Sequence, residues 1–565
     1  MTAGSPLQRG LIRTLDALRV KEWLKPIVLD LLEFAGVEHS FARTPQVFER
    51  LSRLGRPTPG NQSGTRVLVL SFRGAWLLHG TWEAIIAEAL RRRGASPTLF
   101  VCSGGLPEVL PGKSPACGIA SAYSPGPASC SDCLKCGLTL ASAFNLPVLR
   151  LDDFVDKKKA RALMAEVEAL DDSQISSLEH RGLPIGEYIT NSARWCLCVS
   201  DLDFPDGQRV TRSFAKSARV VSEAVPGLLD RVKPEVVFLL NGLFFAERIV
   251  KAEAERRGIR VVSYERGFMP NTLCFGEGIP AYYDLSPLWE SVKDTPLTPT
   301  EEARLDAYLA ERRRGLRAPF QYWPTITEDA KEVLEALSLD AARPTAVLFT
   351  NITWDSAAQD RDVMFPSMYG WVLACVRHFA QHHESQLVVR IHPAEVRVPG
   401  WETRDPLLNH LRKDFPVLPP NIKIVPPESD LSSYTLMTLS RCGLVYTSTA
   451  GLELAMEGLP VIVAGNVHYG GKGFTWDPKD REDYLASIEK ALDASRDPLT
   501  QERARRYAYA FFFRYFLPFP LVSENAPDFV PTLESEDPAV LDPGADTTLD
   551  LVCRGILTGG GFFAP

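Results

Sequence analysis

The segment VYTSTAGLELAMEGLPVIVAGN, residues 445–466, contains residues suited to binding an anion. An apolar run ends at a cluster of hydroxyl residues, and a helix-like stretch and a second apolar run follow. Free backbone N–H groups at a helix start bind phosphate, with a few tenths to about 1 kcal/mol from the helix dipole alone. The segment predicts a phosphate site at Ser448, Thr449 and Gly451. Glu453 is predicted to accept hydrogen bonds from a ribose or base, and a helix start without a ligand is the alternative.

Three more strand-like segments of the same half end in polar residues. SQLVVRIHP places Arg390, a cation with phosphate-binding geometry, and His392, a hydrogen-bond donor, before Pro393. FTNITWDSA places Asp355 after another apolar run. A glycine-rich loop, GNVHYGGKGFTWD, follows the third run and carries His468, Tyr469 and Lys472. Ligands of parallel sheets lie outside the carboxyl ends of the strands, so we expect one nucleotide site here.

For a displacement that inverts configuration, a base that accepts a proton from a hydroxyl is expected in the other half of the chain; the sequence leaves inversion and retention both open. Glu265 ends the apolar run IRVVSYE, and His79 lies in the loop SFRGAWLLHG. Both residue types act as general bases. The alternatives are an ion pair of Glu265 with Arg266 and a packing or helix-start role for His79.

The sequence indicates chemistry without a metal at this site. No D-x-D pattern ends a strand, and Asp201-Leu202-Asp203 is interpreted as a surface turn. Charge that develops on a leaving phosphate is then stabilised by cations and backbone amides. Arg390, His392 and Lys472 fit that role.

Five of the 11 cysteines lie in one stretch, and the last three form C-x-x-C-x-x-C. This spacing is typical of iron–sulfur ligation, whereas structural zinc prefers two separated C-x-x-C pairs. We predict an iron–sulfur cluster or a zinc ion that braces an insertion, and buried thiols are the alternative. The expected ligands are Cys117, Cys130, Cys133 and Cys136, with Cys102 as another candidate. Cys196 and Cys198 are interpreted as strand residues.

Length and composition indicate a multidomain globular protein. A chain of 565 residues is long for one core, and a net charge of −8 argues against general nucleic-acid binding. No apolar run approaches the ~20 residues that span a bilayer. The N-terminus lacks a signal-peptide pattern, so we expect a cytoplasmic protein.

Alternating strand and helix patterns predict an α/β fold with two doubly wound, Rossmann-like domains. A helix capped by Thr300 is expected in the linker. The aromatic stretch 503–520 is interpreted as a helix that returns to pack on the first lobe, with contact to a membrane surface as the alternative. The expected order is N-terminal helices (1–55), an acceptor-side domain (56–290) with the cysteine-rich insertion (102–136), a linker (291–340), a nucleotide-sugar-binding domain (341–500), and a return helix and tail (501–565).

Several motifs resemble those of a known family. The motifs are R-x-H-P, PPESDLSSYTL, S-T-x-G-L-E, HYGGKGFT and the segment from PEVVFLLNG to VVSYERG. Together they resemble bacterial capsule polysaccharide biosynthesis proteins, which are GT-B glycosyltransferases related to Kdo transferases and to sialyl- and polysialyltransferases. The resemblance covers roughly residues 230–480. It implies that His392, Pro393, Ser448 and Thr449 bind the phosphate and ribose of a nucleotide.

The resemblance implies a glycosyltransferase that builds a surface polysaccharide or glycoconjugate. Its partners would be a nucleotide-sugar and a glycan acceptor, without nucleic acid, and a peripheral position at the inner membrane is an alternative to a purely cytoplasmic one. The acidic base motif of the sialyltransferases is missing, so CMP-, UDP- and GDP-sugars all stay open as donors. The alternatives are a nucleotide-sugar 2-epimerase and a non-catalytic sensor built on a metal cluster.

Overall fold

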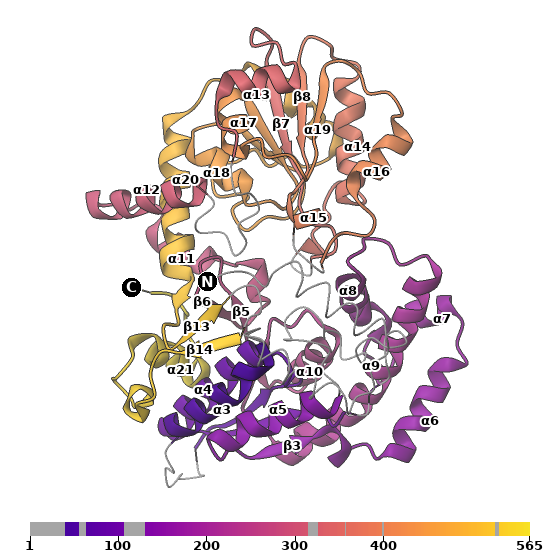
Figure 1. The fold of residues 1–565 in the computed structure, drawn as a ribbon, viewed down its shortest axis with the longest axis vertical. Coiled ribbons are helices and arrows are strands. Elements are labelled where there is room, and N and C mark those ends of the chain that lie inside the picture. Colours follow the sequence, from indigo (N-terminus) through magenta and orange to yellow (C-terminus); the bar gives the residue numbers. More distant parts are fainter. Residues whose placement is uncertain are drawn as a thin grey trace, which may run out of the picture.

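The computed structural model describes residues 40–55, 64–104, 106, 130–314, 326–355, 358–397, 401–525 and 530–564. Figure 1 shows two lobes, one above the other, and each contains a largely parallel sheet flanked by helices. The predicted α/β class with two doubly wound domains is confirmed. Residues 1–39 and 107–129 lie outside the described residues, and with them most of the predicted N-terminal helices and Cys117.

The lower lobe contains a seven-stranded sheet in the order β12-β6-β5-β4-β1-β2-β3. The pairs from β5 to β3 are parallel, while β6 and β12 are antiparallel at one edge. The near-continuous apolar runs of β1 and β4 suit parallel strands that are buried on both faces. The strands are β1 Arg66–Leu70, β2 Ser96–Val101, β3 Val148–Arg150, β4 Val236–Leu240, β5 Arg260–Arg266, β6 Thr272–Gly276 and β12 Leu517–Pro518.

Helices cover both faces of this sheet. One face packs against α3, α4, α5 and the C-terminal α21, and the other against α8, α9 and α10 with α6 and α7 outside them. The helices are α3 Ser40–Leu54, α4 Leu77–Arg92, α5 Cys130–Ala143, α6 Lys157–Glu168, α7 Asp172–Ser176, α8 Ile185–Leu197, α9 Pro205–Val232 and α10 Phe245–Arg256. The short 3-10 helices η1 Leu151–Asp153 and η2 Pro280–Tyr282 also belong to this lobe.

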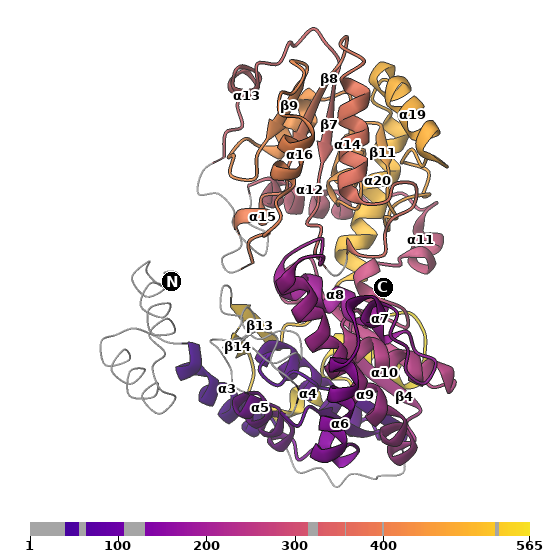
Figure 2. The ribbon, with the colours of Figure 1, turned by 90° about the vertical axis from the view of Figure 1, so that its right-hand side faces the viewer.

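The upper lobe contains an all-parallel five-stranded sheet in the order β11-β10-β7-β8-β9. Its strands are β7 Thr345–Phe349, β8 Gln386–Arg390, β9 Ile422–Val425, β10 Cys442–Val445 and β11 Val461–Val463. Its helices are α13 Ala330–Leu337, α14 Met368–Phe379, α15 Ala394–Arg397, α16 Leu407–Asp414, α17 Ser433–Leu439, α18 Ala450–Met456 and α19 Arg481–Asp493. In both views α15, which follows β8, lies at the end of this lobe nearest the lower lobe (Figures 1 and 2). The carboxyl ends of the strands therefore face the other lobe.

The chain crosses between the lobes twice. α11 Ser286–Val292 and α12 Pro299–Arg313 lead upward, and α20 Pro498–Ala510 with the π-helix Phe511–Tyr515 leads back. The aromatic side chains of the return segment are buried in a cluster that also contains α11, α12 and α18. These side chains therefore serve as core. The remaining elements are β13 Val522–Asn525, β14 Val530–Leu533, η5 Pro538–Leu541 and α21 Thr547–Thr558.

Two local expectations were wrong, and one was right. The N-cap of α12 is Thr298 and not Thr300, because Pro299 occupies the first helical position and Thr298 forms a capping box with Glu301. Cys196 lies in the last turn of α8 and Cys198 caps it in the left-handed region, so neither is a strand residue. The D-x-D pattern is an exposed turn, as predicted, in which the Asp203 amide donates to Asp201.

None of the helices in the described ranges is both long enough and apolar enough to cross a membrane.

Candidate functional site

Hydrogen bonds join the loops that follow the strands of the upper sheet. The Thr350 hydroxyl, after β7, accepts from the His392 amide, after β8, at 2.9 Å. The Asn351 side chain donates to the Thr447 hydroxyl, after β10, at 3.0 Å. The loop after β11 joins the same set, because the Asn466 amide donates to the Arg361 carbonyl at 2.9 Å. The sequence-predicted polar residues therefore lie on connected loops at one sheet edge.

The His392 ring is oriented by its own loop. Its Nδ1 accepts a hydrogen bond from the Ala394 amide at 3.1 Å, so the proton of the neutral ring is assigned to Nε2. Burial, with Arg390 as a second cause, lowers the pKa of His392 to about 4. At neutral pH the residue is a neutral Nε2–H donor, which suits a phosphate or carbonyl oxygen.

The loop between β10 and α18 is fixed by close packing. The Tyr469 hydroxyl donates to the Ser448 carbonyl, and a Cβ added at Gly451 would lie 2.2 Å from that hydroxyl oxygen. Gly451 is therefore required by the approach of Tyr469, which is fully buried beneath the loop. The Ser448 hydroxyl accepts from the Ala450 amide at 3.3 Å, and Thr449 makes no side-chain cap.

α18 contributes less electrostatic stabilisation than the sequence suggested. It spans seven residues, about two turns, so few peptide dipoles add up at its start. Glu453 accepts a hydrogen bond from the Arg312 side chain of α12 at 2.9 Å and is itself buried. The structure thus gives Glu453 a partner inside the protein.

Arg390 is also held by the protein. Its side chain is 3% exposed and donates to the carbonyls of Pro426 at 2.9 Å and of Ser429 at 3.1 Å. Burial lowers the pKa of Arg390 to about 10. In this geometry Arg390 fixes the loop after β9, and a phosphate would have to displace one of these carbonyls to reach it. Lys472 donates to the Ser286 hydroxyl of α11 at 3.1 Å.

A second cation, which the sequence analysis did not single out, lies between the lobes. The guanidinium of Arg361 stacks over the Tyr282 ring of the lower lobe, with its carbon 3.9 Å from the ring centroid. Arg361 is 7% exposed, and it donates to the Asn466 carbonyl at 3.1 Å. Burial lowers its pKa from the usual value.

His468 lies near Arg361, and one of its two ring nitrogens is a buried hydrogen-bond acceptor. Its Nδ1 is 3.0 Å from the Tyr507 hydroxyl, which itself donates to the His468 carbonyl, so Nδ1 carries the proton. Nε2 is then an acceptor, and it is buried without a hydrogen-bond partner. Burial, and after it the charges of Arg361 and Lys472, lower the pKa of His468 to about 3. A ligand hydroxyl or N–H would satisfy this nitrogen.

Glu265 is the acidic residue that the lower lobe brings to the same place. It accepts hydrogen bonds from the Asn241 side chain and the Arg266 amide, both at 2.8 Å. Burial raises its pKa, and the charge of Asp355 in the upper lobe adds to the rise. The Arg266 side chain forms an ion pair with Glu524.

Tyr283 connects these groups across the lobes. Burial raises its pKa well above the usual value, and the charges of Glu265 and Asp355 raise it further while Arg361 lowers it. Its ring also lies edge-on to His468, with ring centroids 5.4 Å apart. The side chains of both lobes therefore converge around Tyr283.

His79 lies apart from this group. It is 7% exposed, and its Nδ1 is 3.2 Å from the Tyr264 hydroxyl, which donates to Glu83. Rings of Trp76 and Trp82 pack against it. Burial lowers the pKa of His79 to about 3, so the imidazole is a weak base at neutral pH. These features favour the packing role.

The lobes contact each other directly at α8. The Arg194 side chain donates to Gln359, the Ser200 amide donates to Asp405 at 2.9 Å, and the rings of Trp195 and Trp401 lie 4.1 Å apart. The Trp354 indole donates to the Thr403 hydroxyl at 2.8 Å and stacks on Trp401. The contact holds the loop that carries Asp355 against the lower lobe.

The predicted iron–sulfur or zinc site is not supported. Within the part of the chain that the structure describes, Cys102, Cys130, Cys133 and Cys136 do not form a group that could hold an ion. The physical reason is that C-x-x-C-x-x-C lies on α5, where helix geometry puts the first and third cysteines about 9 Å apart along the axis and about 120° apart around it. Cys133 accepts from the Ala75 amide at 3.3 Å, and burial raises the pKa of Cys133 and that of Cys136, the latter to about 11. Cys117 lies outside the described residues.

Solved structures show distant similarity in fold. A β-Kdo 2,4-transferase, KpsC of Thermosulfurimonas dismutans, matches 54% of this chain and 86% of its own with 17% identity and a TM-score of 0.33. The UDP-GlcNAc 2-epimerase of Neisseria meningitidis matches 78% of this chain and 97% of its own with 11% identity and a TM-score of 0.24. The calicheamicin glycosyltransferase CalG4 matches 79% and 93% with 13% identity and a TM-score of 0.24. At these identities and TM-scores the similarity concerns the fold alone, and the activities in those names are properties of those proteins.

No protein-family model matches the chain, and neither does any curated protein.

Proposed function

We propose that this protein is a glycosyltransferase that moves a sugar from a nucleotide-sugar to a hydroxyl of a saccharide or glycoconjugate in surface polysaccharide biosynthesis. The observation that carries the proposal is the convergence of Glu265 from the lower lobe with Asp355, Arg361 and His468 from the upper one. This arrangement suits a two-substrate transfer in which each lobe holds one reactant and a base lies where they meet.

The upper lobe supplies donor binding in this proposal. His392 donates from Nε2 to a phosphate oxygen, and the hydroxyls of the 447–449 loop follow β10, which β7 separates from β8 in the sheet. Arg361 supplies the positive charge that meets the leaving phosphate, and charge-assisted contacts of this kind stabilise it as bond cleavage proceeds. His468 accepts from a ribose or base at its unpartnered Nε2.

The lower lobe supplies the base. Glu265 receives the proton of the acceptor hydroxyl while that oxygen attacks the anomeric carbon and the nucleotide phosphate departs. A pKa above the ordinary value makes the carboxylate a stronger base, and the Asn241 side chain fixes its orientation. Arg390, Glu453 and Tyr469 act as positioning residues, since their polar atoms contact the protein itself.

A panel of CMP-, UDP- and GDP-sugars, scored for binding and for slow hydrolysis, tests the proposal. We expect one nucleotide class to bind and to release its sugar to water at a low rate. Conversion of UDP-GlcNAc to its 2-epimer without an acceptor would instead assign an epimerase. Lack of binding to every member of the panel would overturn the nucleotide site.

A further inference from the structure

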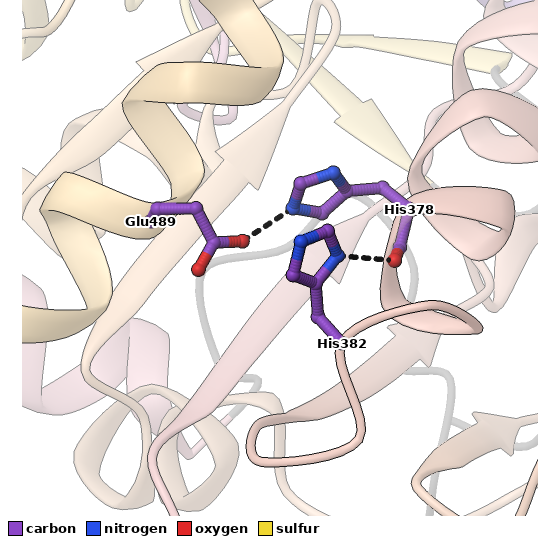
Figure 3. Close-up of side chains that lie close together, drawn as sticks. All are labelled: His378, His382 and Glu489. Carbon is purple, nitrogen blue, oxygen red and sulfur yellow. Dashed lines mark hydrogen bonds and ion pairs between the residues drawn. The ribbon is translucent and has the colours of Figure 1, made fainter.

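A cluster of metal-ligating side chains lies away from the candidate site. His378 is in the last turn of α14, His382 follows that helix, and Glu489 projects from α19 (Figure 3). One ligand atom from each lies within 4.8 Å of the others, and this is the one such group of three among the described residues. From α14 the chain leads into the start of β8, so the cluster lies at the amino ends of the strands, opposite the site between the lobes.

We propose that His378, His382 and Glu489 bind a divalent first-row transition metal ion, with zinc as the reference ion. Two imidazoles and a carboxylate suit such ions, and three protein ligands leave one position for water. A tetrahedral zinc ion with bonds of about 2.0–2.2 Å needs ligand atoms about 3.5 Å apart. Small side-chain rotations from the observed spacing reach that distance.

The orientation of His382 is the strongest support. Its Nδ1 donates to the His378 carbonyl at 2.8 Å, so in the neutral ring Nε2 carries the lone pair. In Figure 3 this second nitrogen points toward the space between His378 and Glu489. A backbone carbonyl that holds the other ring nitrogen is the usual arrangement of a metal-bound histidine.

His378 and Glu489 supply the other two ligands. His378 Nε2 hydrogen-bonds to a Glu489 oxygen, and the two histidine rings stack with centroids 4.2 Å apart. A metal ion would take the place of the proton that this hydrogen bond shares. The side chain of His378 is 10% exposed and that of Glu489 is 43% exposed, so the ion can enter from solvent.

Charges around the cluster favour a cation. Both histidines lie at the C-terminal end of α14, where the helix dipole carries partial negative charge. The charge of Glu384 also acts on His378. An ion bound here would join α14 to α19 and stabilise the upper lobe, without a part in the transfer reaction.

Zinc titration of tag-free protein, stripped with a chelator, tests the inference. We expect one ion per chain and a higher Tm with zinc. His382→Asn and Glu489→Gln should each weaken zinc binding by at least about 100-fold. Loss of a residue that only hydrogen-bonds to a metal ligand costs up to about 100-fold, so loss of a ligand itself should cost at least as much. His383→Asn is the matched control, because this neighbouring histidine contacts Asn421 and lies outside the group. Its zinc affinity should stay unchanged.

Cobalt separates this site from the cysteines. Cobalt bound by imidazole and carboxylate gives weak visible bands, whereas thiolate ligands add intense near-ultraviolet charge-transfer absorption. We expect the first spectrum, and its loss in His382→Asn protein that keeps the circular dichroism of the parent. Thiolate absorption, equal zinc affinity in His382→Asn protein, or no stoichiometric binding would overturn the proposal.

Discussion

The two lobes use the same sheet architecture but treat their polar side chains differently. At the lower sheet edge, charges are neutralised in pairs such as Arg73 with Glu247, which are buried beside Trp76 and Phe244. At the upper edge, hydroxyls and imidazoles are oriented by backbone groups and by neighbouring loops. The upper lobe therefore offers many oriented donors and acceptors, while the lower lobe presents one carboxylate, Glu265, at the boundary.

This difference explains how a duplicated architecture could divide a reaction. A lobe rich in oriented polar groups can recognise a charged nucleotide, since each group is already placed before binding. An edge of paired charges and aromatic rings binds such a ligand poorly but raises the pKa of a carboxylate by burial. The following predictions test whether recognition and proton transfer are divided between the lobes in this way.

Glu265→Gln should have the largest effect. A general base contributes about 10²–10⁴-fold to rate and little to donor binding, so turnover should collapse while the nucleotide dissociation constant stays nearly unchanged. In the parent, activity should fall as pH decreases through the raised pKa of Glu265, because the protonated acid cannot accept the hydroxyl proton.

Glu277→Gln is the matched control for this variant. Glu277 is an exposed carboxylate that pairs with Arg260 just beyond β6, so its turnover should equal that of the parent. Full turnover in Glu265→Gln protein would show that the base lies elsewhere. It would also contradict the division of nucleotide recognition and proton transfer between the two lobes.

Arg361 and Arg390 should differ in what they lose. Arg361→Gln should weaken nucleotide binding by about 10–100-fold, because a hydrogen bond to a charged group contributes about 1.5–3 kcal/mol. Arg390→Gln should instead lower the free energy of unfolding by about 1–3 kcal/mol, since it removes two hydrogen bonds to carbonyls of the loop after β9. Urea unfolding and nucleotide calorimetry on both variants decide the matter. Equal losses of nucleotide affinity in the two variants would indicate that Arg390 binds the phosphate as well.

Gly451→Ala should disturb the upper lobe alone. The new methyl group would meet the Tyr469 hydroxyl, and overpacking of this kind costs about 1–3 kcal/mol. Displacement of the 447–449 loop should weaken nucleotide binding as well. Gly278→Ala, where nothing lies within 4 Å of the added Cβ, is the control and should be neutral by thermal unfolding. An unchanged Tm in Gly451→Ala protein would show that Tyr469 moves at no cost.

The sequence predicted the strand ends well because each signal is local. An apolar run followed by hydroxyls, glycine or proline marks a strand end whatever the rest of the chain does, and this placed His392 after β8 and Ser448 after β10, at the same edge of the sheet. The hydrogen-bond partners of a side chain cannot be predicted from such local patterns. Arg390 is paired with carbonyls some 40 residues further on, and nothing in R-x-H-P indicates that.

Arg361 and Tyr283 are residues that the sequence analysis missed. Both lie in irregular segments without periodicity, and they approach each other only because the lobes meet. The adjacent tyrosines at 282 and 283 were a signal of sorts, since exposed aromatics in loops are enriched in binding sites. The metal site predicted from the cysteine motif is not supported. The spacing of the motif is compatible with a helix as well as with a ligand loop, and α5 is a helix.

The smallest effect expected is on the pH dependence of stability, where a buried acid and buried histidines act at opposite ends of the pH range. In the lower lobe, burial raises the pKa of Glu83 to about 8. The folded protein therefore holds a proton that the unfolded chain has lost above its ordinary pKa, so this contribution to stability is complete below about pH 4.5 and fades as pH rises to about 8. In the upper lobe, burial lowers the pKa of His392 to about 4 and that of His468 to about 3, so stability is lost as pH falls below about 6.5, where the unfolded chain binds the protons. Glu83→Gln should flatten the decline in unfolding free energy between pH 6 and 8 and leave the acid limb unchanged, whereas His468→Gln should flatten only the acid limb. Urea unfolding at several pH values measures both slopes, and a decline on the alkaline side that survives in Glu83→Gln protein would assign it to a different buried acid.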